Sequence, residues 1–370
     1  MEVAAPILSH KDFLKIDKDY QAAASVAQLR YVCDKDPGIE RIKKGSGFSY
    51  RFRGKTVQDS GTLQRIKKLA IPPAWTRVWI CPSDEGHIQA TGYDVRGRKQ
   101  YRYHMRWSAL QQETKFHRMI EFGKALPQLR KQIMKDLSLP GFPQEKISAT
   151  LLSVMEMTSI RIGNEGYEKL YGSYGLTTLK DNHVNIKGDQ VTFSFKGKKG
   201  VYHKVQLKSK KFARIIRQCK AIPGKELFQY YDEQGEHRKV DSGQVNQYLK
   251  DCLGMDFTTK DFRTWAGTLS MLEELRTLPP CEKKLDYQKN ITTALNAVSK
   301  KLGNTVAVCK KYYVHPEIVN LYKDQKLNDF LCSGDLPDND KQEGLSSEEV
   351  ILMKLLKVVE KSKVELQLPK

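Results

Sequence analysis

Several motifs that mark common classes of enzyme and secreted protein are missing from this chain. The seven cysteines include no Cys-x-x-Cys pair, so neither a zinc knuckle nor a disulfide framework is indicated and a reducing compartment is expected. There is no Gly-x-x-x-x-Gly-Lys-Ser/Thr loop and no His-Glu-x-x-His motif. Their absence argues against hydrolysis of a nucleoside triphosphate through such a loop and against a zinc site of that kind. We therefore predict that no metal ion is essential.

Long apolar runs are also missing. The N-terminus has no basic segment followed by an apolar stretch, and the apolar segment from Val350 to Leu356 is interrupted by Lys354. These stretches are much shorter than a membrane-spanning helix. We expect a soluble, cytoplasmic protein without a membrane partner, associated with the nucleoid if the source is bacterial.

Positive charge and core-forming residues are both abundant. The chain of 370 residues has 63 Lys and Arg against 43 Asp and Glu, which gives a formal net charge of +20. An excess of this size makes nucleic acid the first candidate partner. With 39% hydrophobic residues, 17 Tyr and 13 Phe, the sequence is too rich in core formers for a disordered basic tail. Its length predicts two or three folded domains.

Two patterns follow one another along the chain. Between residues 39 and 103, short strand-like segments are separated by Gly, Pro and Asp, which is typical of a small antiparallel β domain. These segments are FSYRF (48–52), RVWICP (77–82), HIQATGYD (87–94) and KQYRYH (99–104). After Trp107 apolar residues recur at helical spacing, which predicts a mostly helical second domain. The helices are expected at 110–129, 147–162, 212–220, 243–253, 262–275 and 285–302.

One stretch of the helical part has the period of a sheet. Residues 183–187, 191–196 and 201–207 alternate apolar and polar side chains, and residues 197–200, Gly-Lys-Lys-Gly, join the last two segments. This pattern predicts a three-stranded antiparallel sheet with lysines at a hairpin tip.

Four side chains are candidates for chemistry on a polyanion. Without a metal, arginine is the best donor for developing phosphoryl charge, because its planar fork meets two oxygens at once. Arg161 ends an apolar helix, and Arg263 lies near a helix start capped by Thr259 or Asp261; either arginine could instead form a structural ion pair.

Lys198 and Tyr313 are equally ambiguous when taken singly. Lys198 lies in a turn, where lysines are commonly just exposed, and its alternative role is a general acid delivered to a substrate groove. Tyr313 could be an ordinary amphipathic-helix residue with its hydroxyl at the surface.

Five segments taken in order resemble the active-site motifs of the type IB DNA topoisomerases, in their compact bacterial and poxvirus-like form. They are RIGNEGY (161–167), FKGKKG (195–200), KDFRTWAGT (260–268), KLGNT (301–305) and CKKYYVHP (309–316). The β-rich half independently resembles the family's N-terminal DNA-clamping domain, through PPAWTRVWICP (72–82) and GHIQATGYDVRGRKQYRYH (86–104). The resemblance covers about residues 30–325, and five ordered motifs are far more specific than any one of them.

The resemblance implies how the reaction is divided among these residues. Tyr313 would be the nucleophile that forms a 3′-phosphotyrosyl enzyme and expels a 5′-hydroxyl strand. Arg161 and Arg263 would hold the non-bridging phosphoryl oxygens. Lys198 would protonate the departing 5′ oxygen, and Lys260 would assist it.

Two further inferences concern the motif that precedes the nucleophile. Tyr313 follows Asn304 by nine residues, the family's spacing between its fourth and fifth catalytic positions, whereas Tyr312 is one residue short. Asn304 departs from the poxvirus-like members, which carry His there, although some bacterial relatives are understood to have Asn. Asparagine donates a hydrogen bond but carries no charge, so no pH dependence is expected from this position.

The resemblance also implies a set of DNA-contacting residues. Arginines and glutamine suit phosphates and base edges, whereas strand tyrosines are also common in ordinary sheet packing. The positions are Arg96, Arg98, Gln100, Tyr101, Tyr103 and Tyr167.

Together these observations predict an α+β protein of the tyrosine recombinase and topoisomerase IB type. We expect a β-rich DNA-clamping domain over residues 1–105 and a mainly α-helical catalytic domain with a three-stranded antiparallel sheet over 106–330. An acidic linker and a helix that packs on the catalytic domain should follow over 331–370. The expected activity is relaxation of positive and negative supercoils in double-stranded DNA, by a monomer that clamps the duplex and needs neither ATP nor a divalent metal.

Two alternatives remain open at this point. A tyrosine recombinase uses a similar Arg, Lys, Arg, Tyr set, but it would normally show His-x-x-Arg where this chain has Lys260-Asp261-Phe262-Arg263. A non-catalytic DNA-binding protein would explain the charge without any chemistry.

Overall fold

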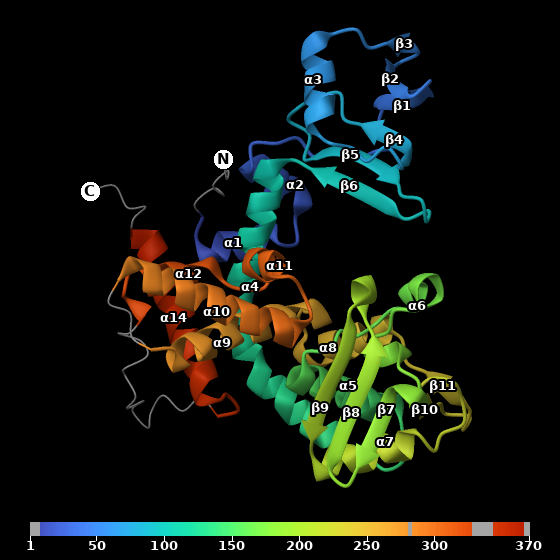
Figure 1. Cartoon of the computed structure of the whole chain (residues 1–370), viewed down its shortest axis with the longest axis vertical. Helices are drawn as coiled ribbons and strands as arrows, with labels where there is room; N and C mark the ends of the chain where they lie inside the picture. Colours follow the sequence, from blue (N-terminus) through green and yellow to red (C-terminus); the bar gives the residue numbers. More distant parts are fainter. Residues whose placement is uncertain (1–7, 280–282, 328–342, 366–370) are drawn as a thin grey trace. The chain divides into compact units, whose positions relative to one another are not determined.

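The chain folds into two compact units (Figure 1). The computed structural model describes residues 8–279, 283–327 and 343–365. One unit comprises Met1–Arg118 with Glu360–Lys370, and the other comprises Met119–Val359. The division falls inside helix α4 (Met105–Asp136). Because one continuous helix carries the chain from the first unit into the second, no loop marks the boundary.

The first unit contains a six-stranded antiparallel sheet. Its strand order is β3-β2-β1-β4-β5-β6. The strands are β1 (Ile39–Lys44), β2 (Gly47–Phe52), β3 (Lys55–Thr56), β4 (Thr76–Ile80), β5 (Ile88–Tyr93) and β6 (Lys99–Tyr103). Helix α3 (Ser60–Lys68) adds Ile66 to the core formed by Ile39, Val78, Ile80 and Ala90. Strand β1 and helix α3 were not predicted from the sequence. Each buries only one residue completely, so neither shows a clear hydrophobic periodicity.

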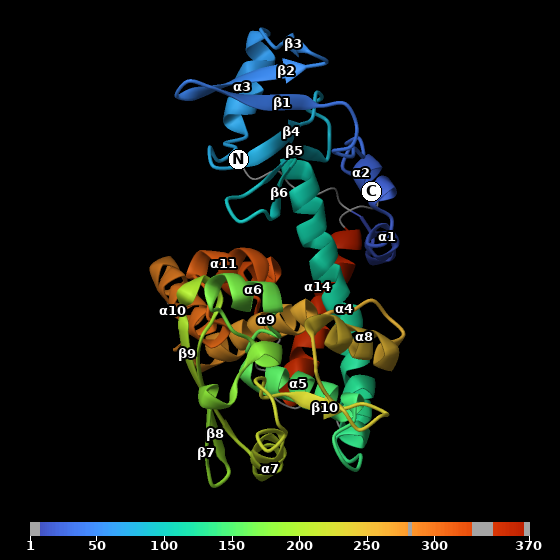
Figure 2. The same cartoon turned by 90° about the vertical axis from the view of Figure 1, so that its right-hand side faces the viewer.

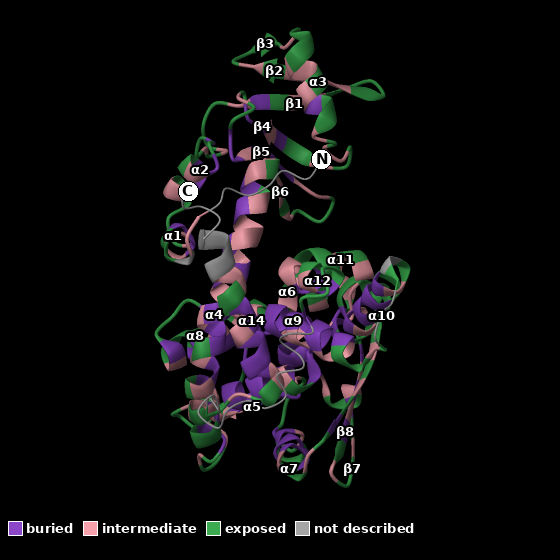
Figure 3. Cartoon of the chain, turned by 90° about the vertical axis from the view of Figure 1, so that its left-hand side faces the viewer, coloured by how far each residue is buried: buried purple, intermediate pink, exposed green. Residues whose placement is uncertain are grey.

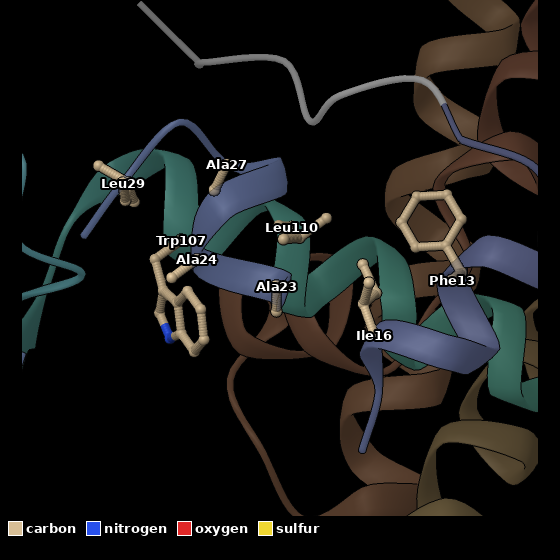
Figure 4. Packing of buried hydrophobic residues seen from close by; sticks show 8 residues of the cluster. All are labelled: Phe13, Ile16, Ala23, Ala24, Ala27, Leu29, Trp107 and Leu110. Atoms are coloured by element: carbon tan, nitrogen blue, oxygen red, sulfur yellow. The ribbon is translucent and has the colours of Figure 1, made fainter. Parts of the chain in front are cut away.

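Two short helices form a second core in this unit (Figure 4). They are α1 (His10–Ile16) and α2 (Tyr20–Val26), and their inner side chains meet Trp107 and Leu110 at the start of α4. The contact surface of α2 is made of alanines, Ala23 and Ala24 among them. Small side chains let this helix approach α4 closely, and the aromatic ring of Trp107 covers them.

The second unit is built around two helices that are buried along much of their length (Figure 3). They are α5 (Gln144–Thr158), which is fully buried from Ile147 to Met155, and α9 (Thr259–Thr277). A helix that is apolar on most sides must lie inside the fold. Around them lie α7 (Lys210–Cys219), α8 (Ser242–Leu253), α10 (Lys284–Leu302), α11 (Val306–Tyr312), α12 (Pro316–Lys323) and α14 (Ser347–Glu365).

The predicted three-stranded sheet lies at one side of this unit (Figure 2). It consists of β7 (Val184–Lys187), β8 (Gln190–Lys196) and β9 (Tyr202–Lys208), all antiparallel. The tip of the β8–β9 hairpin closes through a hydrogen bond of 2.7 Å from the Gly197 amide to the Val201 carbonyl. Lys199 and Gly200 adopt positive φ angles of 62° and 79° there, as a tight turn between paired strands requires.

The α+β fold class predicted from the sequence is confirmed, but two local predictions were wrong. Helix α5 does not extend to residue 162, because Ser159 takes the left-handed conformation with φ 56° and ends it; Arg161 therefore lies beyond the helix. Helix α9 is capped by Thr258, not by Thr259 or Asp261, although Asp261 completes the capping box through the Thr258 amide. No helix in the described ranges is both long enough and apolar enough to cross a membrane.

An ion-pair network around the buried Glu349 attaches α14 to the helical core. The Arg130 guanidinium donates to both Glu349 oxygens at 2.8 Å and to Glu156 at 2.6 Å, and the Trp265 indole donates to Glu349 at 3.0 Å. Burial alone would raise the pKa of Glu349, but these hydrogen bonds and one from the Ser346 amide hold it below the ordinary value of 4.5. Through Arg130 the network reaches Glu156 of α5, and the Glu349 carboxylate itself joins α14 to α4 and α9.

Removing that carboxylate should destabilise the protein strongly. We expect Glu349→Ala to lower the free energy of unfolding by about 1.5–3 kcal/mol, because Arg130 keeps Glu156 but loses its hydrogen bonds to Glu349, and the buried Trp265 indole loses its acceptor. The matched control is Glu348→Ala, which breaks an exposed pair with Arg276 at 3.5 Å and should cost no more than about 1 kcal/mol. Urea denaturation measures both changes, and equal costs would contradict this account.

The contribution of Glu349 to stability should also depend on pH. Because the folded pKa of Glu349 is depressed, its contribution to the free energy of unfolding is complete above pH 4.5 and is lost as the pH falls further.

Candidate active site

Arg161 is placed by a backbone segment that other parts of the chain hold in position. After the left-handed Ser159, the Arg161 carbonyl accepts from the Leu176 amide at 2.9 Å and the Ile162 carbonyl from the Thr177 amide at 2.7 Å. Gly163 then passes directly against Gly175, where a Cβ atom on Gly175 would lie 2.5 Å from the Gly163 Cα. Two glycines are thus needed for this crossing, which fixes where the Arg161 side chain starts.

The guanidinium groups of Arg161 and Arg263 both bind the end of α10. Arg161 donates to the Asn304 side-chain oxygen at 2.6 Å and to the Gly303 carbonyl at 3.4 Å. Arg263 donates to the Leu302 carbonyl at 2.8 Å and also to the Ser159 carbonyl. Cations are favoured at the negative end of a helix, and carbonyls satisfy the arginines without cancelling their charge.

Burial shifts the pKa values of both arginines downward. It lowers the pKa of Arg161 to about 10, with a further contribution from the charge of Arg263. Burial also lowers the pKa of Arg263, and the attraction of Tyr313 opposes this shift. Both groups stay charged at neutral pH, and none of the ion pairs found among the described residues involves either of them. Because the charge of Arg263 acts on Arg161, binding of an anion to both would be favoured.

Two donors near these arginines have no acceptor. Arg263 Nε and Asn304 Nδ2 are buried, and neither has a hydrogen-bond partner among the described residues. Because the Asn304 oxygen already accepts from Arg161, its amide nitrogen is the group left to donate. Leaving a buried donor unpaired costs about 1–3 kcal/mol, so an acceptor that fills this position, such as a phosphoryl oxygen, would be bound well.

Tyr313 lies beside Arg263. It is the C-terminal cap of α11, and its ring centroid is 5.3 Å from the Arg263 guanidinium carbon. Its carbonyl accepts from Thr268 at 3.0 Å, and a Cβ on Gly267 would lie 2.7 Å from the same carbonyl oxygen. Gly267 and Arg263 are four residues apart and so share one face of α9. In contrast, Tyr312 is 47% exposed and its ring lies by Lys311.

The two lysines predicted for the site lie outside this cluster. Lys198 is exposed at the tip of the β8–β9 hairpin, and its ammonium is 5.5 Å from the ring centroid of Tyr167 in α6 (Glu165–Tyr171). The structure therefore brings Lys198 and Tyr167 together. Lys260 is exposed in the first turn of α9, three residues before Arg263.

The other predicted DNA-contacting residues lie on the β5–β6 hairpin of the first unit. Asp94, which the sequence motifs did not single out, holds several of them in place. Asp94 accepts hydrogen bonds from Arg98 Nε at 2.7 Å, from Gln100 at 3.1 Å, and from the amides of Arg96 and Arg98 at 3.0 Å each. The hydrogen bond from the Arg98 side chain is the main cause of a lowered Asp94 pKa, about 2. Because the Gln100 side-chain nitrogen donates to Asp94, the side-chain oxygen of Gln100 is the atom that can accept a hydrogen bond from a ligand. The available signal was an Asp at the start of a Gly-containing turn, where its side chain accepts from the amide two residues on, that of Arg96, as in an Asx turn.

Tyr101 and Tyr103 alternate with Arg102 along β6. They are 43% and 44% exposed, and their rings stack with centroids 5.6 Å apart. Arg102 points to the other face, where it donates to the Ala70 carbonyl at 2.8 Å. The two tyrosines therefore form an exposed aromatic surface and are not part of the sheet core.

Comparison with known proteins agrees with the resemblance seen in the motifs. Residues 104–330 match the family model described as the catalytic core of eukaryotic DNA topoisomerase I, and residues 47–94 match that of the N-terminal domain of bacterial DNA topoisomerase IB. Among similar proteins, DNA topoisomerase 1B of Acanthamoeba polyphaga mimivirus is 34% identical over 295 residues, which cover 77% of this chain and 88% of the viral protein.

More distant relatives extend the comparison. DNA topoisomerase 1B of vaccinia virus (strain Copenhagen) is 24% identical over 243 residues, 64% of this chain and 73% of that protein. DNA topoisomerase 1 of Schizosaccharomyces pombe is 26% identical over 198 residues, 52% of this chain and 22% of the yeast protein. Because matches cover both the β-rich unit and the helical unit, and one relative is similar over most of its length, this chain belongs to the type IB DNA topoisomerases.

Proposed function

We propose that this protein relaxes positive and negative supercoils by cutting and rejoining one strand of duplex DNA at Tyr313. The observation that carries the proposal is the pair of buried arginines, Arg161 and Arg263, held by carbonyls beside that tyrosine. A phosphodiester placed there would meet both positive charges and two unpaired donors. Donors fixed in advance around developing charge are the main source of catalytic power in sites of this kind.

The proposed reaction exchanges one phosphoester bond for another. The Tyr313 oxygen attacks phosphorus and gives up its proton to water, a bond to the 3′-side phosphate forms, and the bond to the 5′ oxygen breaks. Lys198 gives its proton to that 5′ oxygen, which leaves as a hydroxyl. Religation is the reverse step, so no bond energy has to be supplied and ATP is not required. The two arginines and Lys198 supply the charge stabilisation and the proton that a metal ion would otherwise provide.

Asn304 and the arginines divide the stabilisation of the transition state. The arginines neutralise the charge that develops on the non-bridging oxygens. Asn304, oriented by Arg161, donates one neutral hydrogen bond through its amide nitrogen. An amide does not titrate, so this position adds no ionisation to the pH profile. Lys260, exposed in the first turn of α9, assists Lys198.

Binding of the duplex is assigned to both units. Arg96, Arg98 and Gln100 would contact phosphates and base edges, and Tyr101 and Tyr103 would contact the backbone with their exposed rings, as would Tyr167 in the helical unit. The net charge of +20 favours this binding at low salt. We infer a monomer whose two units close around the DNA, acting in the cytoplasm, at the nucleoid if the cell is bacterial.

The nucleophile is tested by comparing two neighbouring tyrosines. We expect Tyr313→Phe to bind DNA but to relax no plasmid, because the attacking oxygen is gone, whereas the matched control Tyr312→Phe should relax it at close to the wild-type rate. The assay is plasmid relaxation in EDTA without ATP. Loss of activity in the Tyr312 variant alone would overturn the assignment, and an inert wild type would overturn the proposed function.

The general acid is tested with a substrate that does not need one. We expect Lys198→Ala to slow cleavage of an ordinary duplex about 10²–10⁴-fold, the usual contribution of general acid catalysis. If sulfur replaces the 5′ bridging oxygen, the leaving thiolate is stable without a proton, and the variant should cleave at nearly the wild-type rate. Lys199→Ala, at the adjacent turn position, is the control. An equal defect on both substrates would mean that Lys198 does not deliver the proton.

A further inference from the structure

His203 has a place in the helical unit that the reaction described above does not use. It lies on β9 opposite Phe195 of β8, and the two rings stack with centroids 5.2 Å apart. In the alternation of β9 it shares a face with Val205 and with the buried Leu207. The sequence signal for His203 was a histidine on the packed face of an amphipathic strand. It lies in none of the five motifs.

The His203 ring is wedged between two glycines from different parts of the chain. A Cβ on Gly197, in the turn of the hairpin, would lie 2.5 Å from the ring. A Cβ on Gly303, the residue that ends α10, would lie even closer to it. Both positions must be glycine for the ring to fit, because a Cβ atom does not approach other atoms so closely.

These two glycines directly precede two residues of the proposed active site. Gly197 is followed by Lys198, and Gly303 is followed by Asn304. The Gly303 carbonyl also accepts from Arg161. One imidazole ring therefore touches both the hairpin that carries the lysine and the helix end that binds the arginine.

Burial and the nearby arginines favour the neutral form of the His203 ring. Burial lowers its pKa below the ordinary 6.5, and the cations of Arg161 and Arg263 lower it further. Its other packing partners, Phe195 and the two glycines, carry no charge. A neutral ring can lie next to the arginines without repelling them.

We propose that His203 is a positioning residue that fixes the β8–β9 hairpin against the end of α10, so that Lys198 reaches the same phosphodiester as Arg161 and Asn304. This inference rests on the proposed function, because it assumes that Lys198 protonates the leaving oxygen. Without the ring, the hairpin loses its contact with α10 and the lysine is no longer held at the phosphodiester. A displacement of about 1 Å can cost about 10² in rate.

The experiment compares single-turnover cleavage of a duplex oligonucleotide by wild type and His203→Ala. We expect the variant to cleave about 10²-fold more slowly, with DNA affinity unchanged. On the duplex with a sulfur leaving atom the defect should nearly disappear, because that substrate does not need Lys198. A purely structural defect would slow both substrates equally, and that result, or no defect at all, would overturn the inference.

Gly197→Ala tests the same contact from the other side. Gly197 has φ −92°, which alanine adopts without strain, so its methyl group acts only by pushing the ring. We expect the same preference for the sulfur substrate, and no additional loss when Gly197→Ala is combined with His203→Ala, since the space is then open. Additive losses in the double variant would contradict the contact.

Two controls separate the possible failures. His237→Ala removes an exposed histidine of β11 (His237–Lys239) and should leave cleavage and thermal unfolding unchanged. Thermal unfolding of every variant verifies that it folds. If wild type forms no covalent complex with either substrate, the proposed function fails; if wild type cleaves and only the His203 pattern is missing, this inference alone fails.

Discussion

Two positively charged side chains, Arg161 and Arg263, lie at the end of α10, and no carboxylate of the described residues forms an ion pair with either. The arrangement of the site depends on that constraint. Arg161 and Arg263 donate to the backbone carbonyls of Ser159, Leu302 and Gly303. Backbone carbonyls position a guanidinium and leave its charge available. The end of α5 and the end of α10 thus converge on the arginines, and the remaining charge is left for an anion from outside the protein.

The chemistry is divided between a rigid part and an exposed part of this unit. The arginines, Asn304 and the backbone of Tyr313 lie among buried helices, where charge stabilisation gains from low dielectric and fixed geometry. Lys198 lies instead on an exposed hairpin tip. A proton donor in such a place needs something to hold it at the phosphodiester, and His203 is the residue that connects the two parts.

Local patterns predicted the elements of the fold where periodicity is strong. The alternation in residues 191–207 predicted β8, β9 and their turn, and the helix predicted over 285–302 ends where α10 ends. The pattern failed at the end of α5, because apolar residues continue through Ile162, whereas the carbonyls of Arg161 and Ile162 accept from the distant amides of Leu176 and Thr177. The sequence around residue 162 does not show hydrogen bonds to residues that far along the chain.

Site residues could be predicted only in part, for the same reason. Tyr313 and the arginines were ambiguous singly and became specific through the order of five motifs. Asp94, which holds Arg98 and Gln100, and His203, which lies against glycines about 100 residues apart in sequence, act through contacts that folding creates. A residue whose role is to orient another is recognisable only once both are placed in space.

The central claim is that a phosphodiester occupies the space between the two arginines, with Tyr313 attacking it. The most direct measurement is mass spectrometry of peptides from the denatured protein–DNA adduct, after digestion of both the protein and the DNA. The account predicts a nucleotide joined through its 3′ phosphate to the oxygen of Tyr313. A nucleotide on Tyr312 or on another side chain, or a link through a 5′ phosphate, would contradict it.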